Sequence, residues 1–483
     1  MQASLNYLNK NWLLDTKEAQ QLYFEGAIPL RKKVGIVDVH THHNLRQIVE
    51  NKPFPNIWRA EVLEDKEEYK NNDHYIIQLA AKFNGFSQSF ARDSNISDFD
   101  KWMALAKVFP QIEGNHVHQW MHLDLKRMFG IENLLNAETG EQIWNLTGEQ
   151  LPEESFLPLN ILKRVNARLI CTTDDPCDDL LYHKQAAEIP WIKFIPTFRP
   201  DAYCNIFESN WGTHVERLCQ LTGQDVTLKG LIAGLRQRHT YFAKMGARAS
   251  DHGLLEPYGL EVEEKKAEQI FQEAYEKRKN YNINTQETRE FISYLMHQFC
   301  AMNQDAGMVT QIHYGAVRNT NKYLFNNWGS DVGGDVAAEY TNVVENLNPL
   351  LSKFFSGKTE SEEHLVLYSM NQIFFHTNLM LERAFPNVHT GFPWWQNDNI
   401  YNMEHYLLHL ISASLWSSSA GPVCDGRKVL SEGSRFEVFD RIICRVLGKL
   451  WSTGAVSKEG AFRASKGLMV ENQLKIFSLQ NLL

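Results

Sequence analysis

Short runs of apolar, β-branched residues recur along the chain and alternate with longer stretches of helical periodicity. These β-rich runs lie at residues 34–40, 167–173, 191–198, 308–315, 364–370, 387–392 and 421–426. Residues 260–302 show the helical pattern, because a stretch of dense mixed charge is followed by an apolar stripe at helical spacing, with Asn284 and Thr285 as the expected caps between them. Strands separated by helices predict βαβ units and a parallel sheet.

Reactive side chains gather at the carboxyl ends of these runs. They are His40 and His42, Asp174 and Asp175, Arg199, His313, Asn371, Trp394 and Trp395, and Asp425 and Arg427. Such a distribution is typical of a (β/α)8 barrel, whereas a doubly wound open sheet concentrates its chemistry at one switch point. We therefore expect an α/β fold, a distorted (β/α)8 TIM barrel formed by one domain over residues 1–483. The interval at about 45–160 is too long for one crossover and is expected to be a mainly helical insertion after the first strand.

Composition narrows the class of protein. The 483 residues include 43% hydrophobic and 22% charged residues, which is ordinary for a soluble globular protein. A net charge of -9 argues against a nucleic-acid partner, and neither a signal peptide nor an apolar run long enough to cross a membrane is seen. Seven scattered cysteines without a C-x-x-C pair are typical of reduced thiols, which predicts a cytoplasmic protein.

The stretch VGIVDVHTHHN, residues 34–44, ends a β-rich run in several histidines. Buried imidazoles cost free energy unless their nitrogens are satisfied, so the stretch predicts a site. Side chains two apart on a strand point the same way, which puts Asp38, His40 and His42 on one face and His43 on the other. Two imidazoles form half of a divalent-metal site, and Asp425 is the expected third ligand. A histidine-rich turn bonded to backbone and water is the alternative.

Two arginines stand where they can hold an anionic ligand. Arg427 lies two residues after Asp425, and its planar guanidinium suits a carboxylate, although a surface ion pair explains the same spacing. Arg199 follows a β-rich run and precedes a proline, and a loop clamp with Asp201 is its alternative. The fork of Arg427 matters if the substrate is anionic, and the structural alternative stays open for each arginine.

Three further groups have both a functional and a structural interpretation. His74 and Tyr75 place an imidazole beside a phenol, and a phenol near a metal or a guanidinium can move a proton, but such a pair is usually structural. His313 closes a strand, where it can ligate a metal, bind substrate or cap a core network. Trp394 and Trp395 suit the C–H face of a sugar, with core filling as the default.

In their order along the chain, these motifs resemble the uronate isomerase (glucuronate isomerase) family of the amidohydrolase superfamily. The matching blocks are DVHTH, DHY, GNHVHQWMHLDLKRMFGI, IWN, CTTDDPCDDLLYH, PTFRPDAYCNI, ARASDHGL, QIHYGAVRNTN, GSDVGGD, LYSMNQ, WWQND, CDGR and RFEVFDRIICRVLG. The resemblance implies a barrel of the metal-dependent hydrolase type and a zinc-type divalent ion held by His40, His42 and Asp425. It also implies interconversion of D-glucuronate with D-fructuronate, and of D-galacturonate with D-tagaturonate, in the cytoplasm.

The resemblance further implies roles for single residues. Asp425, with a hydroxyl of the sugar, would start transfer of the C2 proton toward C1, and Tyr75 would pass a proton between the oxygens of a cis-enediol. The resemblance also implies that Arg427 is a catalytic residue. The substrate would contact His74, Arg199, His313, Trp394 and Trp395.

Some positions depart from the family pattern and leave the preferred uronate open. Gln78 replaces a usual arginine, Gln119 stands where a histidine is usual, and Phe436 replaces another histidine. A metal-dependent hydrolase of a sugar lactone and a catalytically inactive sugar-acid binding protein are the competing interpretations. The expected partner is a hexuronate, without nucleic acid or membrane, and a homo-oligomer is compatible with the sequence.

Overall fold

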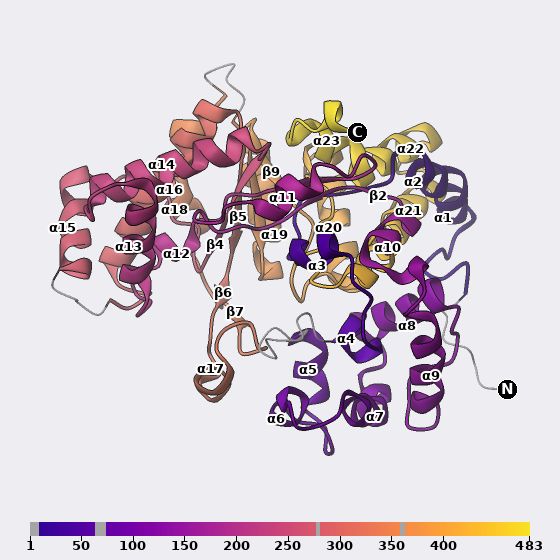
Figure 1. Ribbon diagram of the computed structural model, residues 1–483. Coiled ribbons are helices and arrows are strands. Elements are labelled where there is room, and N and C mark those ends of the chain that lie inside the picture. The colour runs from indigo at the N-terminus through magenta and orange to yellow at the C-terminus, as the bar shows by residue number, and fades with distance from the viewer. Residues whose placement is uncertain (1–8, 63–73, 277–280, 358–362) are drawn as a thin grey trace.

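The computed structural model describes residues 9–62, 74–276, 281–357 and 363–483, and its strands form parallel sheets among helices (Figure 1). One sheet has the order β1 (Ile36–Asp38), β2 (Ala167–Cys171) and β3 (Lys193–Ile195). The second has the order β4 (Ala249–Leu254), β5 (Val309–Tyr314), β8 (Leu365–Ser369) and β9 (Val388–Thr390). A small antiparallel pair consists of β6 (Ala316–Val317) and β7 (Val336–Ala337). The predicted α/β organisation with parallel strands is confirmed.

Helices occupy the intervals between the strands. Before β1 lie α1 (Lys17–Gln21) and α2 (Ile28–Val34). Between β1 and β2 lie α3 (Leu45–Glu50), α4 (Ile57–Glu61), α5 (His74–Ala80), α6 (Gln88–Arg92), α7 (Asp98–Val108), α8 (His116–Phe129), α9 (Gly140–Gln150) and α10 (Pro158–Arg164). Between β2 and β5 lie α11 (Leu181–Ala186), α12 (Asp201–Cys204), α13 (Trp211–Thr222), α14 (Leu228–Lys244), α15 (Glu264–Tyr275) and α16 (Gln286–Ala306).

The remaining helices follow the later strands. They are α17 (Lys322–Trp328), α18 (Val343–Phe354), α19 (Phe375–Ala384), α20 (Ile400–Ala413), α21 (Glu432–Ser452), α22 (Lys458–Lys466) and α23 (Asn472–Ile476). Figure 1 shows α13 to α16 and α18 gathered beside β4 and β5, with α1, α2, α21 and α22 together on the side of β2. None of the described helices combines the length and the apolar character needed to cross a membrane.

The predicted helix pair at 260–302 is confirmed as α15 and α16. Thr285 caps α16, because its hydroxyl accepts a hydrogen bond from the backbone N–H of Thr288 at 3.3 Å. The apolar stripe of α16, which includes Phe291, Leu295 and Phe299, is buried. Here local periodicity and capping chemistry sufficed to locate the helix.

Phe198 joins the two parallel sheets. Its backbone N–H donates to the carbonyl of Ala249 at 3.1 Å, and its carbonyl accepts from the N–H of Asp251 at 2.9 Å. It also forms a parallel bridge with Asp174 beyond the end of β2. The β3 edge of one sheet therefore adjoins the β4 edge of the other.

The segment 420–426 connects the opposite edges. Its first residue, Ala420, donates a backbone hydrogen bond to Thr390 of β9 at 2.8 Å, and Asp425 donates to the carbonyl of His40 at 3.1 Å. The sequence predicted a strand here, but the segment forms these isolated bonds rather than a regular ladder. Its place between β9 and the end of β1 brings Asp425 beside the histidines that follow β1.

Strand β4 was not predicted, because its sequence ASDHGL lacks an apolar run. Ser250, Asp251 and His252 are nevertheless fully buried. The Ser250 hydroxyl lies 2.8 Å from Nε2 of His252 and accepts from the Asn303 amide at 2.7 Å, and Asp251 forms ion pairs with His313 and Arg199. A buried strand can be polar when its side chains find partners inside the protein.

Gly448 lies where α21 crosses α1, and it offers a test of this packing. A Cβ at Gly448 would stand 2.5 Å from the backbone nitrogen of Ala19. Gly448→Ala is therefore expected to lower the free energy of unfolding by about 2 kcal/mol, because overpacking against backbone cannot relax cheaply. Gly148, on the exposed face of α9, has open space where a Cβ would stand, so Gly148→Ala should leave stability equal or slightly higher. Urea denaturation compares them, and equal midpoints for both variants would contradict the expectation.

Candidate active site and metal centre

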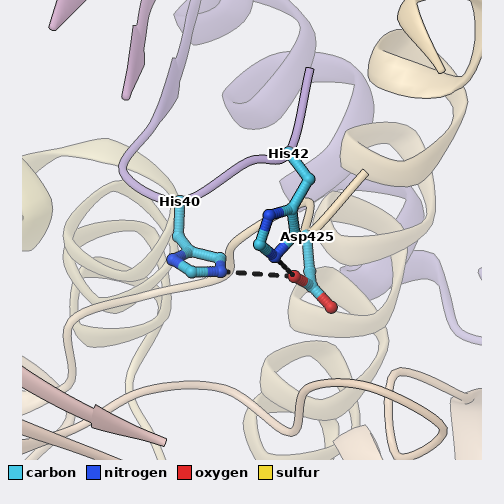
Figure 2. A group of neighbouring side chains, drawn as sticks. All are labelled: His40, His42 and Asp425. Atoms are coloured by element: carbon cyan, nitrogen blue, oxygen red, sulfur yellow. Dashed lines mark ion pairs between the residues drawn. The ribbon is translucent and has the colours of Figure 1, made fainter. Parts of the chain in front are cut away.

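His40, His42 and Asp425 meet at the junction of β1 and the segment 420–426 (Figure 2). The Nε2 atom of each histidine lies 3.2 Å from Oδ1 of Asp425. One ligand atom from each residue lies within 4.8 Å of the others. Figure 2 shows both imidazole rings directed at the carboxylate, so two side chains from one end of the chain and one from the other end share a centre.

The local backbone conformation determines which side chains of this segment point toward the cluster. His43 points away from the cluster, with its Nε2 3.0 Å from the buried carboxylate of Glu432. Asp38 does not join the cluster, although strand alternation placed it on the same face, because its carboxylate accepts from the backbone N–H groups of His40 and Cys424. Asp425 has a left-handed φ of 47°, a conformation that costs free energy and is often found at functional sites.

Burial and the partner charges set the protonation of the cluster. Burial lowers the pKa of His42 to about 4, against the opposite effect of the Asp425 carboxylate, so the imidazole is neutral near pH 7. Burial tends to raise the pKa of Asp425, but His40 and His42 hold it well below its usual range. The hydroxyl of Thr173 lies 2.7 Å from Nδ1 of His42 and fixes the ring so that Nε2 faces the centre.

This donor set fits a divalent metal ion. Neutral imidazole nitrogens and an ionised carboxylate are the forms that ligate metals. Oδ1 of Asp425 is buried, and among the described residues it accepts no hydrogen bond of good geometry, although two imidazole nitrogens lie close to it. A shared cation would satisfy that oxygen. Three protein ligands leave coordination positions for a substrate, as in catalytic metal sites.

The cluster lies in a cavity of about 360 Å³ that collects every site residue proposed from the sequence. These lining residues are His40, His42, His74, Tyr75, Arg199, His313, Trp394, Trp395, Asp425 and Arg427. The sequence did not single out two other lining residues, Arg318 and Asp331. A neighbouring cavity of about 480 Å³ shares Arg199, His313, Arg318, Trp394 and Trp395 with the first.

Asp251 is a buried carboxylate that sequence reasoning missed. Its Oδ1 lies 2.7 Å from Nε2 of His313 and 3.8 Å from Nδ1 of His40, and its Oδ2 lies 3.3 Å from the guanidinium of Arg199. Against burial, His313 and Arg199 hold the pKa of Asp251 well below its usual range. Asp251 therefore orients two candidate substrate contacts. The block ARASDHGL was the only signal, because the polar β4 shows no strand pattern.

Stacked rings form one wall of the cavity. His74 stacks on Tyr75 with ring centroids 4.6 Å apart. His313 stacks on Tyr368 at 4.5 Å and meets Trp394 edge-on at 4.7 Å. These contacts leave few rotamers for each ring, so the wall is held in place before any ligand binds.

The positions that depart from the family pattern lie in different places. Gln78 in α5 lies close to Gly333, since a Cβ at Gly333 would stand 2.9 Å from Cβ of Gln78. Gln119 and Phe436 are not among the described residues that line the cavity. Phe436 contacts Arg31, with the guanidinium 5.0 Å from the ring centroid, and lines a separate cavity. None of the three positions is among the described residues that line the cavity of the cluster, and the preferred uronate stays open.

Comparisons with known proteins agree with the resemblance seen in the sequence. The sequence profile of the glucuronate isomerase family matches residues 5–477. A uronate isomerase from Thermotoga sp. strain RQ2 is 36% identical, over 98% of this chain and 99% of that protein. The crystal structure of a uronate isomerase from Thermotoga maritima has a TM-score of 0.90 at 35% identity, covering 97% and 99% of the two chains. A glucuronate isomerase from Caulobacter crescentus, at 23% identity and a TM-score of 0.89, shows the same fold over 98% and 97%.

Proposed function

Because the chain belongs to the glucuronate isomerase family, it is an isomerase, and we propose that it interconverts an aldohexuronate and a ketohexuronate at the cluster of His40, His42 and Asp425. The proposed pairs are D-glucuronate with D-fructuronate and D-galacturonate with D-tagaturonate. The observation that carries this proposal is the single cavity that contains the cluster together with Tyr75 and the arginines.

The reaction moves one proton from C2 to C1 and another from the C2 oxygen to the C1 oxygen. We assign the first transfer to Asp425, acting with a hydroxyl of the sugar, and the second to the phenol of Tyr75, through a cis-enediol. A divalent ion held by His40, His42 and Asp425 would supply Lewis-acid stabilisation of the anionic sugar acid. The donors of Arg199 and Arg427 face the same cavity and stabilise negative charge on substrate and enediolate.

The remaining proposed contacts orient the sugar. His74 lies against Tyr75, so its ring holds the phenol in place beside the substrate. His313, Trp394 and Trp395 form the wall on which the carbon chain would pack. Each of these side chains is largely buried, which excludes water from the reacting atoms.

We also propose finer properties. The strands are proposed to close into a distorted (β/α)8 TIM barrel of the metal-dependent hydrolase type, supported by the bonds of Phe198 and of the segment 420–426 at the two sheet junctions. Zn²⁺ is the proposed ion, because two imidazoles and one carboxylate are ligands that zinc accepts. The cytoplasm is the proposed compartment, because all seven cysteines are buried and free.

Products formed in deuterated water test the function. The metal-loaded protein is incubated with glucuronate, galacturonate and their lactones, and products are followed by NMR. We expect a ketohexuronate with deuterium at C1, because an enediol route exchanges the transferred proton with solvent. Ring opening of a lactone alone would support the lactone hydrolase, which the named relatives do not favour. Uronate binding without product would indicate a sugar-acid binding protein.

A further inference from the structure

The segment of residues 318–335, which contains α17 and is here called the rim loop, is anchored where it leaves and re-enters the fold. It begins after β6 and ends before β7, and these two strands pair antiparallel. Nη1 of Arg318 lies 3.1 Å from Oδ2 of Asp335, and the backbone N–H of Asn319 donates to Oδ1 of Asp335 at 2.6 Å. The neck of the rim loop is therefore closed, and Asp331, four residues before Asp335, lines the cavity together with Arg318.

Two guanidiniums hold the carboxylate of Asp331 through the same oxygen. Arg318 donates a hydrogen bond to Oδ1, and Nη2 of Arg427 lies 3.9 Å from it. Within the described part of the chain, Oδ2 of Asp331 accepts no hydrogen bond. Burial tends to raise the pKa of Asp331, but Arg318 and Arg427 hold it well below its usual range, so the group is a carboxylate. Its φ of 59° is left-handed, a conformation that aspartate adopts at a cost.

The rim loop also rests on the helix that carries His74 and Tyr75. Gly333 has a φ of 87°, and a Cβ there would stand 2.9 Å from Cβ of Gln78 in α5. This close approach leaves little freedom for the segment that presents Asp331. On the other side, the guanidinium of Arg318 lies 5.1 Å from the centroid of the Trp395 ring.

We infer that Asp331 is a specificity-determining residue that accepts a hydrogen bond from a hydroxyl of the sugar chain through Oδ2. The inference rests on the proposed function. A hexuronate carries several hydroxyl donors, yet Asp331 and Asp425 are the only carboxylates among the described lining residues, and Asp425 faces the histidines. Because the two guanidiniums hold the carboxylate in place, Oδ2 can accept a hydrogen bond only from a hydroxyl that points toward it. Its contribution therefore depends on the orientation of that hydroxyl and not on the charge of the substrate. Epimers that turn one hydroxyl differently should therefore gain unequally from it.

Asp331→Asn tests this role, because it keeps the shape of the side chain and removes its charge. With glucuronate and galacturonate, which differ at one carbon, we expect kcat/KM of the better substrate to fall about tenfold, as for loss of a charged hydrogen bond. The ratio of kcat/KM between the two should change at least about threefold. Inorganic phosphate should inhibit the variant about threefold more strongly, because the two guanidiniums lose one of the negative charges beside them. A site that had merely collapsed would bind phosphate more weakly.

Asp305→Asn is the matched control, because Asp305 forms an exposed pair with Arg236 at 3.0 Å and does not line the cavity. It should leave both kcat/KM values and phosphate inhibition unchanged. If Asp331→Asn left both the ratio of kcat/KM between the two uronates and the inhibition by phosphate unaltered, the inference would be overturned. The proposed function would still stand, provided that the wild-type protein isomerises a uronate. Wild-type protein that isomerises no uronate would overturn the proposed function, and this inference with it.

Discussion

Replacing Asp425 by asparagine is expected to lower kcat by about a thousandfold or more, because one side chain is assigned both proton transfer and metal ligation. Oδ1 of Asp425 lies 3.2 Å from Nε2 of both His40 and His42, so the substitution removes the negative charge that both imidazole rings face. The metal content per chain should fall with it. Ketohexuronate formation and elemental analysis of the dialysed protein measure the two effects separately.

A second buried carboxyl group provides the control for Asp425. Glu382 accepts hydrogen bonds from Thr390 and Ser414 at 2.7 Å, and burial raises its pKa to about 7. Because Glu382 does not line the cavity, Glu382→Gln should keep both metal and activity. The proposed centre is wrong if Asp425→Asn retains its metal and at least about a tenth of the wild-type kcat.

Tyr75→Phe is expected to lower kcat by about a hundredfold or more, which is the contribution of a positioned proton-transfer group. The substitution removes only the hydroxyl, so the stacking with His74 at 4.6 Å should persist and KM should change little. The result separates the two reaction types, because a lactone hydrolase has little need of this phenol. Initial rates with a uronate and with its lactone provide the measurement.

Tyr294→Phe is the matched control, because Tyr294 is buried in α16 and does not line the cavity. It should leave kcat unchanged, and circular dichroism should show both variants folded. If Tyr75→Phe kept isomerase activity within about threefold of wild type, the assigned proton transfer between the two oxygens would be abandoned.

Local pattern was enough for features that a few neighbouring residues specify. The β-branched run before Asp38 predicted β1, and the cap at Thr285 with its apolar stripe predicted α16. The spacing of His40 and His42 predicted two imidazoles directed to one side, because alternation along an extended chain is a local property. The same reasoning failed for Asp38, since the chain leaves β1 after that residue and its carboxylate turns to backbone donors.

Contacts between distant segments were decided by the tertiary structure. Strand β4 was missed because the partners that let Asp251 be buried, His313 and Arg199, come from other strand ends. Arg318 and Asp331 lie in irregular segments on either side of α17, and contacts with other parts of the chain bring them to the cavity. Phe436 is the opposite case. It belongs to a motif of the family, but only the tertiary structure shows that it lines a separate cavity.

The sequence by itself determined the alternation of strands and helices, the two aligned histidines and, through the ordered motifs, the family. Only the tertiary structure decided that Asp425 meets those histidines and that Asp331 is held between two arginines. The physical reason is that periodicity encodes the direction of a side chain relative to its own backbone. Which distant side chain stands opposite is set by how the strands and loops pack together.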